Sequence, residues 1–219
     1  MRKECKIVLP FYKIAYAISF VIILSMIRGV THTFEVGIAM EAPMAILAVV
    51  FCADNYVREI MSKRSQVHRL YPVKRRFFSI LERLMIQEIF LLLLAVTGYG
   101  CFFFFQKPMT HPATGSEAKQ FMIYFASMII TIFFWGNLAN MLSMIFRNMW
   151  GGIGGCLLIW LSVNSSWGDQ CLGAWNLFSY TFREVQNNGD ISWVYGKLMC
   201  LCMGTIMTAV LPKIIKKRG

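Results

Sequence analysis

Six separate apolar runs dominate the chain and leave few architectures open to it. They lie near Tyr12–Val30, Val36–Ala53, Leu84–Phe105, Gln120–Phe146, Trp150–Ser166 and Trp193–Pro212. A helix that crosses the hydrocarbon core of a bilayer needs about 20 apolar residues. In lipid, only helices and closed barrels satisfy all backbone polar groups, and these runs lack the alternation of barrel strands. The runs therefore predict an all-α integral membrane protein with six transmembrane helices.

The composition fits a single transmembrane domain over residues 1–219. Of the 219 residues, 57% are hydrophobic and 15% are charged, whereas soluble domains carry roughly 25% charged residues. No stretch is left for a soluble catalytic domain, so we expect nucleotide hydrolysis, if any, to be done by another chain. The first run is long and has no small-residue cleavage site before Arg28, which argues against a cleaved signal peptide.

The net charge of +11 is distributed unevenly between the two sides of the predicted membrane. With both termini inside, the inner basic residues are Arg2, Lys3, Lys6, Lys13, Arg58, Lys63, Arg64, Arg69, Lys74, Arg75, Arg76, Arg83, Arg147, Lys213, Lys216, Lys217 and Arg218, and the outer ones are Arg28, Lys107, Lys119, Arg183 and Lys197. This excess obeys the positive-inside rule and predicts a plasma-membrane protein with cytosolic termini. Anionic lipid accounts for the basic side, and nucleic acid is not an expected partner.

Residues 55–83 form the only long, strongly basic and amphipathic stretch. Its apolar residues recur at helical spacing in two groups, which are Tyr56, Val57, Ile60 and Met61, and then Val73, Phe77, Ile80 and Leu84. Pro72 interrupts the pattern and suits the first residue of a second helix. The stretch therefore predicts a cytosolic elbow of two short helices. Helices lying on the membrane surface would explain it, and so would a docking element for a cytosolic protein.

Two acidic residues, Glu41 and Glu88, fall inside predicted spans. An ionisable group at that depth is a functional candidate. For Glu41, a paired or snorkelling carboxylate near the interface is the alternative. It could belong to a group of ion pairs with Arg28, His32 and Glu35 at the outer turn.

Two further patterns concern helix packing or a substrate path. Asn137, Asn140 and Ser143, near the end of the fourth span, could hydrogen-bond neighbouring helices or line a path. Gly151 and Gly155 form a GxxxG motif, which lets two helices approach closely. The motif does not say whether its partner is another span of this chain or another subunit.

The outer segment 167–192 is too apolar for a simple solvated loop. Its aromatic residues are Trp167, Trp175, Phe178, Tyr180 and Phe182. We expect short helices at the outer membrane interface, where aromatic side chains gather. Such a segment suits either an interfacial cap or a gate for a peptide.

No catalytic constellation is present in the sequence. It lacks a GxxxxGK[ST] phosphate loop and an HExxH motif, and its three histidines fall in three different loops. Five of its seven cysteines lie in predicted spans, which argues against a disulfide framework. We therefore expect no enzymatic activity and no metal or cofactor bound by this chain.

Six spans, cytosolic ends and the elbow resemble the permease subunits of type-2 ABC exporters. The resemblance is sharpest at Arg58-Glu59 and Leu70-Tyr71-Pro72-Val73-Lys74-Arg75, and Leu142–Asn148 is similar to the end of the family's fourth span. Family members often have a glycine soon after the acidic residue, where this chain has Ser62–Ser65. The small size, the asparagines and the glycine-rich fifth span look most like the lantibiotic-immunity branch, whose permeases expel antimicrobial peptides.

The resemblance implies an ATP-driven exporter of an amphipathic substrate. A cytosolic ATPase dimer, which binds ATP and magnesium itself, would grip the elbow with residues 56–67 inserted into its groove. The implied coupling residues are Arg58, Glu59 and Arg64 for the polar rim and Tyr56, Ile60 and Met61 for the apolar anchor. A second permease, either another copy or a sister chain, would complete the pathway.

Two other functions are compatible with the sequence. A non-transporting membrane sensor or assembly factor would use the elbow to bind a regulatory partner, without any ATPase. A secondary transporter is disfavoured because no broken-helix inverted repeat and no cluster of acids at the midplane is visible.

Overall fold

The computed structural model describes residues 7–55, 71–109, 117–182 and 192–218, and these residues are all-helical with no β-strand. The long helices are α2 (Phe11–Ile27), α3 (Thr33–Cys52), α6 (Val73–Gln106), α7 (Glu117–Phe146), α8 (Met149–Val163) and α11 (Ser192–Arg218). The short ones are α9 (Ser166–Leu172), the 3-10 helix η2 (Gly173–Trp175) and α10 (Ser179–Phe182). The all-helical prediction is confirmed, and each of the six apolar runs forms most of a long helix.

Within the described residues, four helices are long and apolar enough to cross a membrane, namely α3, α6, α7 and α11. The other two apolar helices, α2 and α8, have 17 and 15 residues. Both are shorter than a typical membrane-spanning helix, which has about 20 residues. Crossing by α2 and α8, and hence the six-span topology, stays a prediction.

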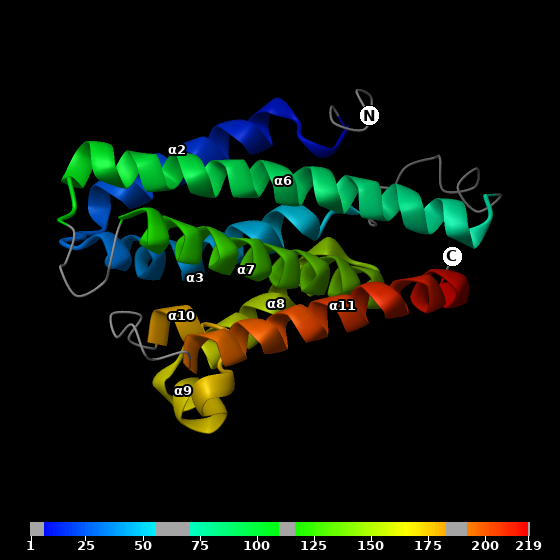
Figure 1. Ribbon diagram of the computed structural model, residues 1–219. Coiled ribbons are helices and arrows are strands. Elements are labelled where there is room, and N and C mark those ends of the chain that lie inside the picture. The colour runs from blue at the N-terminus through cyan, green and yellow to red at the C-terminus, as the bar shows by residue number, and fades with distance from the viewer. Residues whose placement is uncertain (1–6, 56–70, 110–116, 183–191, 219) are drawn as a thin grey trace.

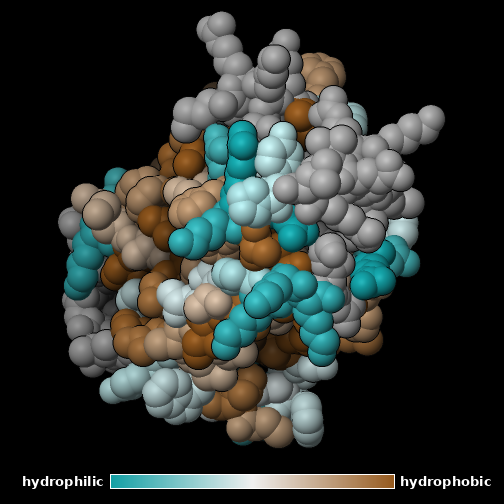
Figure 2. Space-filling view, turned by 90° about the vertical axis from the view of Figure 1, so that its right-hand side faces the viewer, coloured by the Kyte–Doolittle hydropathy of each residue, from teal (hydrophilic) through white to brown (hydrophobic). Residues whose placement is uncertain are grey.

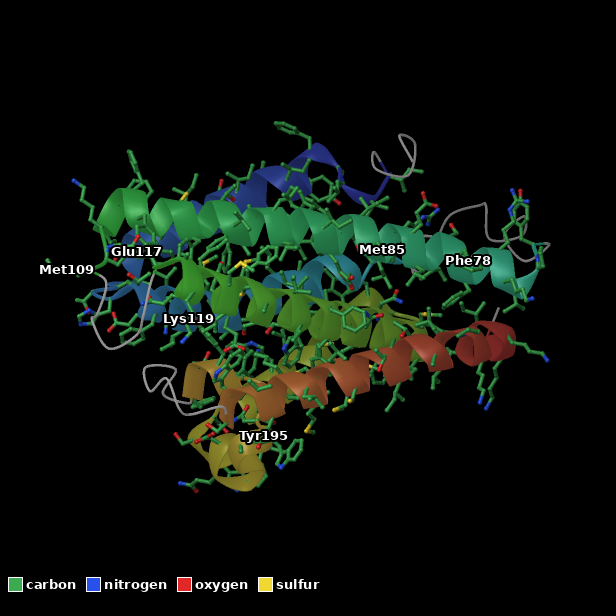
Figure 3. The ribbon with its side chains drawn as sticks, in the orientation of Figure 1. Phe78, Met85, Met109, Glu117, Lys119 and Tyr195 are labelled. Atoms are coloured by element: carbon green, nitrogen blue, oxygen red, sulfur yellow. The ribbon has the colours of Figure 1, made fainter. Side chains whose placement is uncertain are left out.

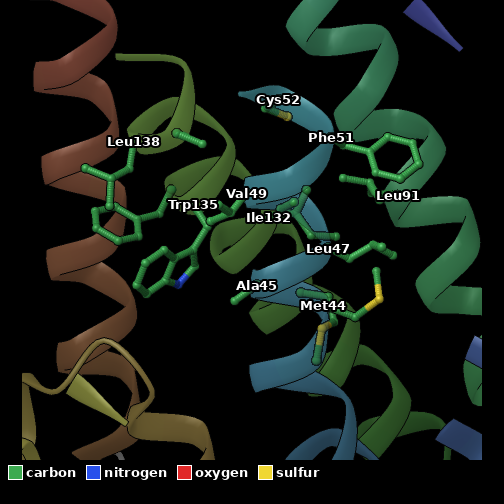
Figure 4. Packing of buried hydrophobic residues seen from close by; sticks show 14 of the residues in the cluster. Met44, Ala45, Leu47, Val49, Phe51, Cys52, Leu91, Ile132, Trp135 and Leu138 are labelled. Carbon is green, nitrogen blue, oxygen red and sulfur yellow. The ribbon is translucent and has the colours of Figure 1, made fainter. Parts of the chain in front are cut away.

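Helices α3 and α7 form the centre of the bundle (Figure 1). Helix α3 packs against α6, α7, α8 and α10, while α7 packs against α3, α6, α8 and α11. Figure 4 shows Ala45 and Val49 of α3 among Ile132 and Trp135 of α7, with Leu91 of α6 on the other side of α3. These side chains are all buried, so the apolar character of α3 is explained by packing within the protein.

The start of α6 and the end of α11 lie at the same end of the bundle (Figure 1), which we call the terminus end. Here both helices continue past α3 and α7. Ile80 and Leu84 of α6 are buried, as are Leu211 and Ile215 of α11, and the two helices are in contact. We call the first turns of α6, Val73–Leu84, together with the last turns of α11, Leu211–Arg218, the α6–α11 projection.

The second helix of the predicted elbow is not a separate element. Helix α6 runs without a break over 34 residues from Val73 to Gln106, which is about 51 Å at 1.5 Å per residue and longer than the roughly 30 Å hydrocarbon core. The third predicted span and the second half of the elbow are therefore one rod. The first half of the elbow, residues 56–70, lies outside the described residues.

Helices α7 and α8 approach most closely at a glycine outside the GxxxG pair. A Cβ atom on Gly152 would lie 2.0 Å from Ser143 Oγ and 2.8 Å from Ser143 Cα. Gly151 and Gly155 also face α7, at Phe146 and Leu142, but with ordinary or slightly tight spacing. The motif thus packs against the preceding helix of the same chain, and Gly152 is the residue that the packing requires.

This packing predicts different effects for two neighbouring glycine substitutions. Gly152→Ala should lower the free energy of unfolding by about 1–3 kcal/mol, because the Ser143 backbone must move. Gly154→Ala is the matched control, since a Cβ atom there meets nothing within 4 Å, and it should be neutral or stabilising by up to about 1 kcal/mol. Unfolding of both variants in neutral detergent tests the prediction, and equal stability of the two would contradict the α7–α8 contact.

Candidate functional site

A buried ion pair joins Lys197 of α11 to Glu41 of α3, and their side chains are 2% and 0% exposed. Lys197 Nζ also donates to Thr131 Oγ1 at 2.7 Å and to the carbonyl oxygen of Leu177 at 3.3 Å. The three ammonium protons thus have three acceptors, as a buried ammonium requires. Charged groups inside membrane helices are costly and are usually retained for a role.

The carboxylate of Glu41 is shared among three elements. Its Oε1 atom binds Lys197 and lies 3.4 Å from the hydroxyl of Thr131 in α7. Its Oε2 atom accepts a hydrogen bond from the hydroxyl of Thr181 in α10. One acidic side chain therefore ties α3 to α7, α10 and α11, and we call these residues together with the Leu177 carbonyl the Glu41 cluster.

The Glu41 cluster lies in the half of the bundle away from the terminus end. Glu41 is eight residues from the start of α3 and Lys197 is five from the start of α11, or about 12 and 8 Å along the two helices. The similar depths let the two side chains meet without a large tilt of either helix. We call this end of the bundle the cap end; the segment 173–182 packs here against α3 and α11.

Two glycines let the segment 173–182 lie directly on the helices. A Cβ atom on Gly196 would be 2.0 Å from the carbonyl oxygen of Asn176, and one on Gly37 would be 2.3 Å from the Tyr180 ring. Ser179 Oγ then donates to the carbonyl of Trp193 at 2.6 Å. A larger residue at Gly37 or Gly196 would lift this segment from α3 or α11.

Aromatic packing divides the outer segment into two parts. Phe178 and Tyr180 are 0% and 2% exposed, and the Phe178 ring stacks on Trp135 with centroids 5.5 Å apart. Trp167 and Trp175 are instead 68% and 51% exposed, which suits contact with lipid headgroups. One part of the segment thus packs in the core and the other part is exposed, and the choice between a cap and a gate stays a prediction.

The Tyr180 hydroxyl lies near the Glu41 cluster. Burial raises the pKa of Tyr180, and the negative charge of Glu41 raises it further. Tyr180 therefore stays protonated and neutral across the physiological pH range.

A second ion pair lies at the terminus end. Lys13 Nζ is 2.8 Å from Asp54 Oδ2, and it donates to the carbonyl of Phe51 at 3.2 Å. Gln87 of α6 donates to the same carbonyl at 2.8 Å and accepts from Asn55 at 2.6 Å. These contacts join α2, the end of α3 and α6 at the terminus end.

Glu88 is placed between α3, α6 and α7. Asn137 Nδ2 donates to Glu88 Oε1 at 3.3 Å and to the carbonyl of Phe133 in its own helix at 2.9 Å. A Cβ atom on Gly136 would lie 3.3 Å from Glu88 Oε1 and 3.1 Å from Cys52 Sγ. The absence of a side chain at Gly136 thus lets Glu88 reach α7.

The other two polar residues of α7 have different surroundings. Asn140 and Ser143 are fully buried, and within the described chain Asn140 Oδ1 and Ser143 Oγ have no hydrogen-bond partner. Ser143 lies against Gly152 of α8. Of the three polar residues predicted near the end of α7, Asn137 is therefore the one that hydrogen-bonds a neighbouring helix.

One predicted grouping is wrong. Glu41 does not join Arg28, His32 and Glu35, because its partner is Lys197. Glu35 instead caps the start of α3, where its carboxylate accepts from the backbone N–H groups of Thr31 and His32 at 2.8 and 3.1 Å.

Sequence reasoning missed Lys197 by counting it among the outer charges. A signal was present, because Lys197 falls inside the apolar run Trp193–Pro212 and is the only charged residue there. The residues predicted to couple to an ATPase, Tyr56, Arg58, Glu59, Ile60, Met61 and Arg64, lie outside the described residues.

The geometry predicts strong coupling between the two charges. Lys197→Met should destabilise the protein by about 3–5 kcal/mol, because it leaves the Glu41 carboxylate buried without a cation. The double variant Lys197→Met with Glu41→Met should recover most of that loss, since no buried charge remains. Lys213→Met, on an exposed residue of the same helix, should have little effect. Unfolding of the unaltered protein, of Glu41→Met and of these three variants in detergent measures the coupling, and additive losses of the two single substitutions in the double variant would contradict the pair.

Comparison of the chain with models of protein families, with curated proteins and with solved structures found no match.

Proposed function

We propose that this chain is the transmembrane permease subunit of an ATP-driven ABC exporter in the plasma membrane, with both termini in the cytosol. It would move an amphipathic substrate, such as an antimicrobial peptide, out of the membrane or the cell. A separate ATPase would supply the energy. The resemblance of residues 58–59 and 70–75 to the exporter elbow is the sequence basis of the proposal, and the α6–α11 projection is the structural observation that supports it.

The projection presents positive charge at the terminus end. Its exposed basic residues are Lys74, Arg75, Lys213, Lys216 and Lys217. Figure 2, which looks onto this end, shows hydrophilic residues gathered there between apolar flanks. Basic residues just beyond apolar helices favour the cytosolic side. An ATPase that reached this end would therefore meet a cytosolic surface.

The predicted coupling segment begins and ends beside the projection. Residues 56–70 connect Asn55, which follows α3, to Tyr71, which precedes α6. Asn55 is tied to Gln87 at 2.6 Å. A partner bound to residues 56–67 would consequently act on the ends of α3 and α6 together.

A continuous α6 offers a route from the coupling segment into the membrane. The helix contacts α3 through Gln87 and α7 through Glu88, and it continues to Gln106 at the cap end. Closure of an ATPase dimer would tilt α6 and shift these polar contacts. In this proposal, the Glu41 cluster keeps the cap closed until α3, α7 and α11 move relative to one another.

A second permease would complete the pathway. Helices α2 and α8 carry large apolar side chains that the described chain leaves exposed, among them Ile27 at 78% and Leu158 at 69%. Lipid would cover part of these faces and a second permease another part. Homodimers and pairs of sister permeases fit this requirement equally.

The proposal predicts that a double substitution in the coupling segment removes the ATPase. Glu59→Arg with Ile60→Asp should abolish its recovery when the tagged full-length chain is purified from native membranes in mild detergent and identified by mass spectrometry. Membrane insertion should be unchanged, because both residues lie in the predicted cytosolic segment.

The matched control carries the same pair of changes on the predicted outer side, Glu184→Arg with Ile191→Asp, and should retain the ATPase. Normal recovery of the ATPase with the coupling variant would rule out this placement of the contact. If the unaltered chain brings down no ATPase even after crosslinking, the exporter proposal fails, and a sensor or a secondary transporter becomes the better account.

A further inference from the structure

A hollow of about 370 Å³ lies at the cap end, apart from the Glu41 cluster and from the coupling segment. It is formed between the last turns of α6 and the first turns of α7, and its lining residues are Tyr99, Gly100, Phe103, Glu117, Ala118 and Phe121. Pockets of a few hundred cubic ångströms suit small ligands or the head of a larger one.

Three of the six lining residues, Tyr99, Phe103 and Phe121, are aromatic. The Tyr99 ring centroid lies 5.1 Å from those of Phe103 and Phe121. Aromatic faces carry negative partial charge and attract weakly hydrated cations such as alkylammonium groups. The Tyr99 hydroxyl is buried and has no hydrogen-bond partner in the described part of the chain, so the ring, and not the hydroxyl, is the part of Tyr99 that would meet a cation.

Glu117 is the one charged residue that lines the hollow. Figure 3 places it at the start of α7, close to the end of α6. Lys119 comes two residues later, which is about 200° around the helix, and it is not among the lining residues. Aromatic faces and the carboxylate thus both favour a positively charged ligand, and no lining residue opposes one.

Gly100 leaves the hollow open. A Cβ atom there would meet nothing within 4 Å, so a larger side chain can enter the space without displacing the protein. Phe104, next to Phe103, is 77% exposed and does not line the hollow. The chain therefore offers a residue that can fill the site and a neighbouring aromatic residue that serves as a control.

The position of the hollow suits a ligand that is both polar and apolar. Glu117 is the first residue of α7 and Tyr99 lies two turns from the end of α6, where both helices approach the membrane boundary. Interfacial aromatic residues alone are common at this depth, but they need neither a hollow nor a carboxylate. A charged head could occupy the site while an apolar tail lies along the lipid-facing side of α6.

We propose that this hollow binds the alkylammonium head of a cationic amphiphile. The inference needs only this chain, so it stands or falls independently of the proposed ATPase.

Choline is a suitable probe, and 3,3-dimethylbutan-1-ol has almost the same shape without the charge. Both would be measured at millimolar concentration by ligand-observed saturation-transfer NMR on the full chain in neutral maltoside micelles. Choline should receive saturation from the unaltered protein, and the uncharged alcohol should bind about tenfold more weakly, because it lacks the cation–π and carboxylate attraction.

Variants locate the binding. Gly100→Leu should fill the hollow and abolish choline transfer, while Gly154→Leu, at another open glycine, should leave it unchanged. Glu117→Gln and Phe103→Leu should each weaken choline binding by several-fold, and Phe104→Leu should not. Unfolding temperatures in the same detergent would confirm that each variant is folded.

Three results would overturn the proposal. Absence of choline transfer from the unaltered protein would show that the hollow does not take an alkylammonium group. Equal transfer to choline and the alcohol would show that charge is not recognised. Full transfer to choline in folded Gly100→Leu would show that the ligand binds elsewhere.

Discussion

A charge removed from water must find a partner, and the Glu41–Lys197 pair satisfies this requirement deep among the helices. Burying either charge there without the other would carry a high free-energy cost. Because Thr131, Thr181 and the Leu177 carbonyl complete their hydrogen bonds, the positions of α7, α10 and the preceding loop depend on the pair. The Glu41–Lys197 ion pair thus fixes the packing of several elements at the cap end.

At the terminus end, too, buried charged and polar side chains have partners, here from α2, α3 and α6. Lys13 and Asp54 pair there, and Gln87 joins them through the Phe51 carbonyl. Glu88 and Asn137 meet one residue further along α6. Helix α6 therefore carries polar contacts on its buried side and a basic projection beyond them. This is the arrangement expected if a force applied at the projection is passed to α3 and α7.

The sequence was sufficient to predict which segments are helical, but not which residues of different helices contact each other. Apolar runs report where the chain can enter lipid, and all of them fold as helices. The second helix of the predicted elbow is continuous with the third span, since Val73, Phe77 and Ile80 lie in the same helix α6 and pack in the core. Periodicity gives the depth of Glu41 but not its partner, which is 156 residues away. Likewise, a GxxxG spacing points to Gly151 and Gly155, whereas the close contact with Ser143 selects Gly152.

The account depends on the side of the membrane to which each end of the bundle belongs, and cysteine accessibility in intact cells measures this most directly. Single cysteines at Arg75, Lys216 and Met109 would replace the seven native ones and be exposed to a membrane-impermeant maleimide. We expect Met109→Cys to react in intact cells, and Arg75→Cys and Lys216→Cys to react only after permeabilisation. Reaction of Lys216→Cys together with Met109→Cys in intact cells would contradict the account, because the projection could then not face a cytosolic ATPase.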